Sequence, residues 1–122
     1  MSDNIIVSMF QWWNDAIRDP NGFTPEAFAR FYTEDAQLIV NSNLRGTGHE
    51  ALAAHFQRVQ EIAPTAQMVL PVAEEFTTPD RAFVHVFERV EDEAGKEMRR
   101  ECMAYAVVEG GRMKLLRVIG ID

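Results

Sequence analysis

Three side chains that could exchange protons lie in the carboxyl-terminal half of the sequence: His85, Glu101 and Tyr105. A carboxylate beside an imidazole fixes the tautomer of the ring and favours its charged form, whereas burial opposes that charge. A tyrosine hydroxyl nearby could donate a hydrogen bond to a developing oxyanion. In an apolar cavity these residue types indicate general acid-base catalysis, with His85 as the base, Glu101 as the group that orients it and Tyr105 as the donor.

The three residues meet only if two predicted strands pair in one register. Residues 81–91 and 97–109 alternate with period two, and a turn signal between them predicts an antiparallel hairpin. A turn centred on Ala94 sets His85 opposite Met103, with the other two candidates on either side. A slip of one residue would reverse the faces. The alternative is that the face carrying His85 is the outer one, in solvent or in a dimer contact.

A second group of polar side chains follows a short predicted strand, residues 37–41, in the polar loop of residues 42–46. Asn41, Asn43 and Arg45 could bind a carbonyl or carboxylate oxygen, because amides and guanidinium groups donate hydrogen bonds. The competing interpretation is a solvated loop with Asx turns. Asn41 is therefore a candidate substrate-binding residue and an alternative oxyanion donor.

Helical signals dominate the first half of the chain. Ser2 or Asp3 is suited to cap a first helix, residues 4–18, whose apolar side chains recur every three to four residues. Trp13 belongs to that apolar stripe and is expected to cover a cavity or core, while the adjacent Trp12 points to another side. Thr24-Pro25 opens a second helix. A Thr47…Glu50 capping box opens a third, which ends near Ile62.

After Pro64 the period changes from helical to two, and four strands are predicted, at residues 67–76, 81–91, 97–109 and 112–121. Pro71 inside the first of these predicts an edge position or a bulge. Helices followed by an antiparallel meander predict an α+β domain, with helices on one face of a strongly curved, mainly antiparallel sheet. Such a layering leaves a cone-shaped apolar pocket, where small ligands bind.

The totals restrict the function. The 122 residues fit one domain, residues 1–122, and the net charge of −7 disfavours both nucleic acid and an anionic membrane surface. Cys102 is the single cysteine and is expected to be a buried, inert thiol. His49 and His55 are six residues apart, too far round a helix to share a metal ion. No cofactor or metal is predicted, and the absence of a signal peptide makes a cytoplasmic protein the default expectation.

Three segments carry a resemblance to a known family. Tyr32-Thr33-Glu34-Asp35-Ala36, the run from Gly46 to Phe56, and Gly111-Arg112-Met113 before an apolar strand resemble the nuclear transport factor 2-like superfamily. More narrowly they are similar to its SnoaL-like and ketosteroid-isomerase-like branch. The resemblance implies a cone-shaped α+β barrel with an apolar pocket, and a homodimer formed through the outer face of the sheet.

The resemblance also tests one activity. Steroid isomerases of this family keep a base, a protonated acid and a tyrosine at positions that Val40, Met103 and the Trp12–Asn14 segment match here. Because none of these residues has the required chemistry, steroid isomerisation by that mechanism is not expected. The same alignment turns Met103 towards the pocket. The rest of its face would turn with it, which makes Phe83, Phe87 and His85 pocket residues beside Trp13, Val40 and Asn41.

The preferred function is a cofactor-free isomerase, cyclase or dehydratase that acts on an apolar cyclic metabolite by proton transfer. One alternative is a non-catalytic ligand-binding or dimerisation domain of the same fold. A second is a hydrolase in which Asn41, Tyr105 and Glu101 hold a water molecule.

Overall fold

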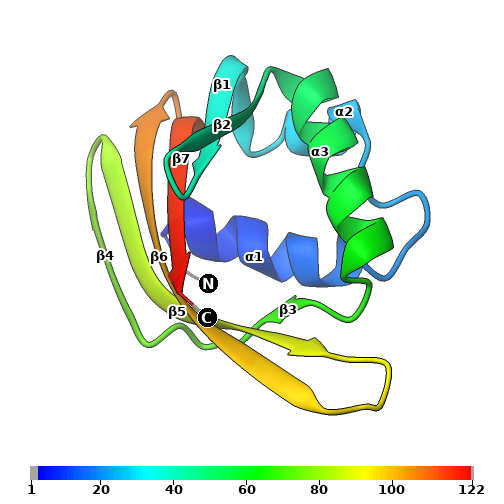
Figure 1. Cartoon of the computed structure of the whole chain (residues 1–122). Helices are drawn as coiled ribbons and strands as arrows, with labels where there is room; N and C mark the ends of the chain where they lie inside the picture. The colour runs from blue at the N-terminus through cyan, green and yellow to red at the C-terminus, as the bar shows by residue number, and fades with distance from the viewer. Residues whose placement is uncertain (1–2, 122) are drawn as a thin grey trace.

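A computed structural model describes residues 3–121 of the chain. Three helices lie on the concave side of one seven-stranded sheet that curves strongly without closing (Figure 1). The strand order is β2-β1-β7-β6-β5-β3, with β4 also paired to β5; β1 and β7 run parallel and the other pairs are antiparallel. The predicted α+β class is confirmed. The elements are α1 (Ile5–Ala16), α2 (Pro25–Phe28), β1 (Tyr32–Val40), β2 (Asn43–Thr47), α3 (His49–Ile62), β3 (Gln67–Met68), β4 (Glu74–Thr78), β5 (Arg81–Glu91), β6 (Glu97–Glu109) and β7 (Arg112–Ile121).

Helix α1 is fixed to the sheet by its first residue. Asn4 is the N-cap: its side-chain oxygen accepts from the Ile6 amide at 3.0 Å, and its side-chain nitrogen donates to the carbonyl of Phe83 in β5 at 3.1 Å. A capping side chain satisfies an amide that the helix itself cannot. The expected caps were Ser2 and Asp3; Asp3 is not the cap, and Ser2 lies outside the described residues.

The segment after α2 departs most from the sequence prediction. The predicted polar loop is strand β2, joined to β1 by a two-residue turn with positive φ at Asn41 and Ser42, as tight hairpins require. The predicted capping box does not form, because the backbone of Thr47 pairs with Gln37 in the sheet. Gly48 is the N-cap of α3 instead, with φ +88° and no side-chain bond.

The predicted strand 67–76 is two separate strands. β3 and β4 both pair with β5, and Leu70–Pro71 lies between them in a cis peptide bond. Proline has no amide hydrogen to give to a ladder, which is consistent with the break in pairing at this point.

The register of the β5–β6 hairpin is confirmed, and the face assigned to it is wrong. His85 pairs with Met103 as a turn centred on Ala94 requires. The helices, however, cover the opposite face, where the side chains are small, so that α1 packs close to the strands. Its buried residues are Ala82, Val84, Val86, Cys102, Ala104 and Ala106.

Aromatic side chains fill the space between the helices. Phe28 is completely buried and its ring stacks on that of Phe56 at 5.6 Å between centroids. Tyr32 is also fully buried, and within the described part of the chain its hydroxyl finds no hydrogen-bond partner. Burial raises the pKa of Tyr32, so this side chain is neutral at physiological pH and contributes as a core aromatic residue.

Candidate functional site

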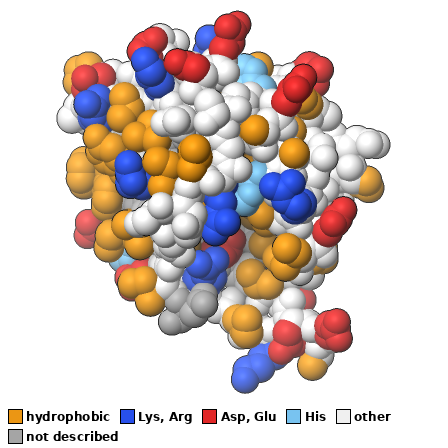
Figure 2. Space-filling view, turned by 45° about the horizontal axis from the view of Figure 1, so that its top comes forward, with side chains coloured by type: hydrophobic (Ala, Val, Ile, Leu, Met, Phe, Trp, Pro, Cys, Tyr) orange, Lys and Arg blue, Asp and Glu red, His pale blue; other side chains and the backbone are white. Residues whose placement is uncertain are grey.

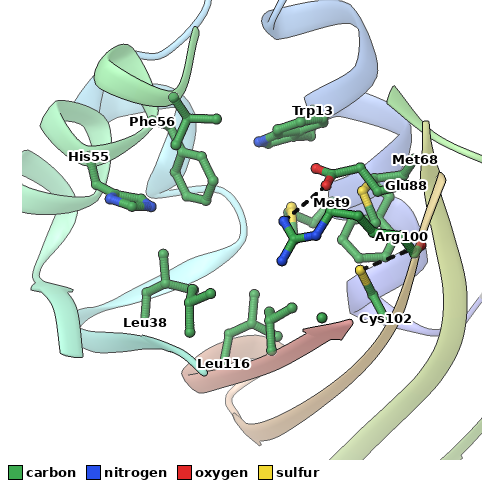
Figure 3. Close-up of a pocket in the computed structure, with 15 residues that line it drawn as sticks. Met9, Trp13, Leu38, His55, Phe56, Met68, Glu88, Arg100, Cys102 and Leu116 are labelled. Atoms are coloured by element: carbon green, nitrogen blue, oxygen red, sulfur yellow. Dashed lines mark hydrogen bonds and ion pairs between the residues drawn. The ribbon is translucent and has the colours of Figure 1, made fainter. Parts of the chain in front are cut away.

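An apolar cavity of about 170 Å³ lies between α1, α3 and the concave face of the sheet (Figure 3). Trp13 from α1 and Val40 from β1 line it, as predicted. The remaining walls are mostly aliphatic, aromatic or sulfur-containing, which is the typical lining of a small-molecule pocket. They comprise Met9, Phe10, Leu38, Phe56, Val59, Met68, Cys102, Leu116, Val118 and Gly120, with His55, Glu88 and Arg100 as the ionisable members.

An ion pair between the two long strands of the hairpin faces this cavity. Glu88 in β5 and Arg100 in β6 are directly opposite in the hairpin register, and Arg100 Nη1 lies 3.3 Å from Glu88 Oε1. Their side chains are 36% (Arg100) and 17% (Glu88) exposed, so the pair is shielded without being dry. Gly120 of β7 leaves room for it, because a Cβ there would come within 2.8 Å of Arg100 Nη2. The cavity wall therefore has space for the Arg100 guanidinium because residue 120 has no side chain.

His55 reaches the same cavity from α3, on the side opposite Arg100 (Figure 3). Its ring packs edge-on against that of Phe56, with 4.9 Å between centroids. Desolvation lowers the pKa of His55, and the positive charges of Arg45 and Arg58 lower it further. The imidazole is therefore neutral at pH 7 and able to accept a proton. A neutral base and a hydrogen-bond donor thus face each other across an apolar space.

The predicted pair of His85 and Glu101 forms, but away from the cavity. His85 Nε2 lies 2.7 Å from Glu101 Oε2 on the outer, convex face of the sheet. Tyr105 is on that face too, where its hydroxyl accepts from Arg81 Nε at 2.8 Å. These three residues do not line the cavity, and neither do Met103, Phe83 and Phe87, because alternation puts all six opposite the small side chains that contact the helices. Their predicted place in the pocket is wrong.

Asn41 also has a different role from the one predicted. Its side-chain oxygen accepts from the Gly120 amide at 3.0 Å, and its carbonyl accepts from Asn43 Nδ2 at 3.2 Å. These bonds hold the β1–β2 turn against β7. His49 Nε2 bonds to the carbonyl of Tyr32, and His49 does not line the cavity that His55 lines.

The sequence interpretation did not select Glu88, Arg100 or His55 as site residues. A signal for the first two was present, since they are opposite charges at paired positions on a face that is otherwise Ala, Val, Cys and Met. A charge on the helix-facing side of a sheet requires a partner or a polar cavity. For His55 the only signal was its place at the edge of the apolar stripe of α3.

No protein-family model and no curated protein matches the sequence. Many solved structures match the fold. One, provisionally described as a SnoaL-like polyketide cyclase from Jannaschia sp. CCS1, has a TM-score of 0.76 at 15% identity, over 95% of this chain and 82% of that chain. The chain has the nuclear transport factor 2-like fold. IdmH from Streptomyces antibioticus, also provisionally a polyketide cyclase, matches it at TM-score 0.76 and 15% identity, over 95% of this chain and 88% of its own.

A third structure with the nuclear transport factor 2-like fold holds a small molecule. It is a ketosteroid-isomerase-like protein from Catenulispora acidiphila in complex with trimethylamine, with a TM-score of 0.74 at 10% identity, over 93% of this chain and 82% of that chain. At such identities the likeness shows the fold and leaves the chemistry to the site. Within residues 3–121, no group of three His, Cys, Asp or Glu side chains could hold a metal ion, and no helix is long and apolar enough to span a membrane.

Proposed function

We propose that this protein is a small cofactor-free enzyme of the isomerase, cyclase or dehydratase type, which acts on an apolar ring-containing metabolite by proton transfer. The observation that carries the proposal is the placing of His55 and Arg100 on opposite sides of one apolar cavity. Neighbours with the same fold that are provisionally described as polyketide cyclases support it. Removal of a proton next to a carbonyl gives an enolate, and a base together with an oxyanion donor promotes that step.

The two residues have complementary roles in this proposal. The guanidinium of Arg100 donates to a substrate carbonyl, and neutral His55 removes a proton from the adjacent carbon. The electron pair forms an enolate whose oxygen Arg100 stabilises. His55 then returns the proton at a second carbon. Alternatively, the enolate carbon attacks a second carbonyl carbon to close a ring, the π electrons of that carbonyl move to its oxygen, and the resulting alkoxide takes the proton from His55. Glu88 holds the guanidinium in position through the ion pair.

The volume of the cavity bounds the substrate. About 170 Å³ is close to the roughly 150 Å³ cavity that encloses benzene. It is smaller than the roughly 300–1,000 Å³ pockets of drug-sized ligands. We therefore expect one ring, or two small fused rings, to be enclosed at a time, with any further part of the substrate outside.

Exchange of the acidic α-protons of β-tetralone for deuterium, followed by NMR in D₂O, tests the proposal. The wild-type protein is expected to accelerate exchange above buffer and above an equal concentration of free imidazole. Val40→Phe, which fills the cavity, is expected to lose at least about nine-tenths of the acceleration, because the ketone no longer enters. Val90→Phe is the matched control, since Val90 is a partly buried residue of β5 outside the cavity.

The same samples separate catalysis from binding alone. Saturation-transfer NMR could show that β-tetralone binds the wild-type protein and that Val40→Phe abolishes this binding. If the wild-type protein then does not accelerate exchange, the protein is a binding domain for such rings. If the ketone neither binds nor exchanges, the cavity is not a site for apolar rings.

A homodimer through the outer face of the sheet is the second part of the proposal. Four apolar side chains on that face of β6 and β7 are 39–65% exposed: Met103, Tyr105, Ile119 and Ile121. Contiguous exposed apolar side chains on a sheet commonly mark an association surface. The hydrogen-bonded pair of His85 and Glu101 lies beside them and would be part of the interface.

Met103→Glu is expected to shift the protein from dimer to monomer in sedimentation velocity at micromolar concentration, because it places a negative charge at the centre of the apolar face. Its circular dichroism should not change, since Met103 is 47% exposed. Ile62→Glu, at an 83% exposed position on α3, is the control and should leave the mass unchanged. A monomeric wild type would refute the dimer.

A further inference from the structure

A second hollow adjoins the cavity at its α3 side. It has a volume of about 390 Å³ and is lined by Leu44, Arg45, His55, Arg58, Val59 and Ile62. His55 and Val59 line both spaces, so the two lie next to each other on either side of these side chains. A ligand whose ring lies in the cavity would therefore have the second hollow within reach on the other side of the imidazole.

The second hollow is basic although the protein is acidic. Arg45 from β2 and Arg58 from α3 are charged residues of its lining, and none of the described residues that line it has a carboxylate, in a chain whose net charge is −7. The positive charges of both guanidinium groups act on His55 and lower its pKa. Within residues 3–121 neither arginine is in an ion pair. Figure 2 shows basic side chains beside a histidine near the middle of the face turned to the viewer, with hydrophobic side chains around them.

Apolar residues border these charges. Leu44 is 58% exposed and Ile62 is 83% exposed, and both line the second hollow. Two unneutralised guanidinium groups between exposed aliphatic side chains suit an amphiphile better than a free inorganic ion, because an inorganic ion would gain nothing from the aliphatic surface.

We propose that the second hollow is an anion subsite, which binds an acidic group attached to the ring system held in the cavity. This rests on the proposed function and narrows its substrate class to ring compounds that carry a carboxylate, sulfonate or phosphate a few bonds from the ring. Arg45 and Arg58 hold the acidic group, while the ring lies beyond His55 against the apolar walls.

Two fluorescent probes of nearly equal shape test the subsite. Anilinonaphthalene sulfonate and N-phenylnaphthylamine share their aromatic framework, and only the first carries an anion. The wild-type protein is expected to bind the sulfonate at least about fivefold more tightly in low salt. That preference should fall as NaCl is raised, because the arginines are exposed and their charges are screened.

Arg45→Gln and Arg58→Gln are each expected to weaken sulfonate binding about two- to fivefold, and the double variant to remove the preference, with binding of the neutral probe unchanged. Arg99→Gln is the matched control, because this exposed arginine of β6 lies on the outer face of the sheet, bonded to Glu97. It should alter neither affinity.

The outcomes separate the subsite from the cavity. Binding of the neutral probe to the wild-type protein but not to Val40→Phe supports the cavity. If the sulfonate then binds no more tightly than the neutral probe, or if the double Gln variant still prefers the sulfonate, the anion subsite is refuted. If neither probe binds, the cavity proposal fails, and the subsite with it.

Discussion

Phe28→Ala is expected to lower the free energy of unfolding by about 3–5 kcal/mol, the range for removing a buried phenylalanine. Phe28 has no exposed surface, and its ring meets those of Trp12, Phe23, Tyr32 and Phe56 at 5.1–5.9 Å between centroids. Helix α2, which carries it, has only four residues and would not persist alone. Loss of the ring therefore removes both the packing and the anchor of the helix.

Urea denaturation at equilibrium measures the effect. Phe76→Ala is the matched control, because the Phe76 side chain is 62% exposed and stacks on Phe83 alone among the described rings. Its cost is expected to be below about 1 kcal/mol. Similar losses in the two variants would mean that the aromatic cluster is not the centre of the core.

The sequence predicts the fold because its local signals agree with one another. The apolar stripe of α1, the Thr24-Pro25 start of α2, and the two long strands joined at Ala94 all appear where expected. Strand β2 was missed because it has only one apolar side chain, Leu44, and is mostly exposed, as at the edge of a sheet. Thr47 carries a capping signature, but pairing with β1 satisfies its backbone first.

The site could be predicted only in part, because alternation defines two faces without saying which one the helices cover. Phe83, Phe87 and Met103 resemble pocket walls because they are large. Helix α1 instead needs a flat surface of small side chains in order to pack closely on a curved sheet, and Ala82 and Ala104 supply it. Side-chain size, more than hydrophobicity, decides the inner face here.

The same geometry makes Glu88 and Arg100 the informative pair for function. At this end of the hairpin the inner face lines the cavity, which leaves space for two charged side chains to pair there. A pair of this kind is weak evidence for stability, since shielding two charges from water offsets most of their attraction. Its retention in an apolar wall is better explained by a role for the guanidinium towards a ligand.

Arg100→Gln is therefore expected to reduce the acceleration of β-tetralone exchange by about 100-fold, the loss typical of removing one oxyanion donor. Glu88→Gln should change it by less than about tenfold, because the guanidinium stays in the wall. Arg100→Gln should also lower the free energy of unfolding by about 1–3 kcal/mol. This is less than for a fully buried pair, because both side chains retain contact with water.

The double variant distinguishes a ligand-binding role from a structural one. Adding Glu88→Gln to Arg100→Gln should recover part of the lost stability, since an uncharged amide replaces the carboxylate that faced Arg100, but it should recover none of the exchange activity. Gly120→Ala gives an independent test, because its methyl group would displace the guanidinium without changing any charge. If the free energy of unfolding and the acceleration of exchange both recover in the double variant, Arg100 has a structural role in the cavity wall and does not bind the substrate.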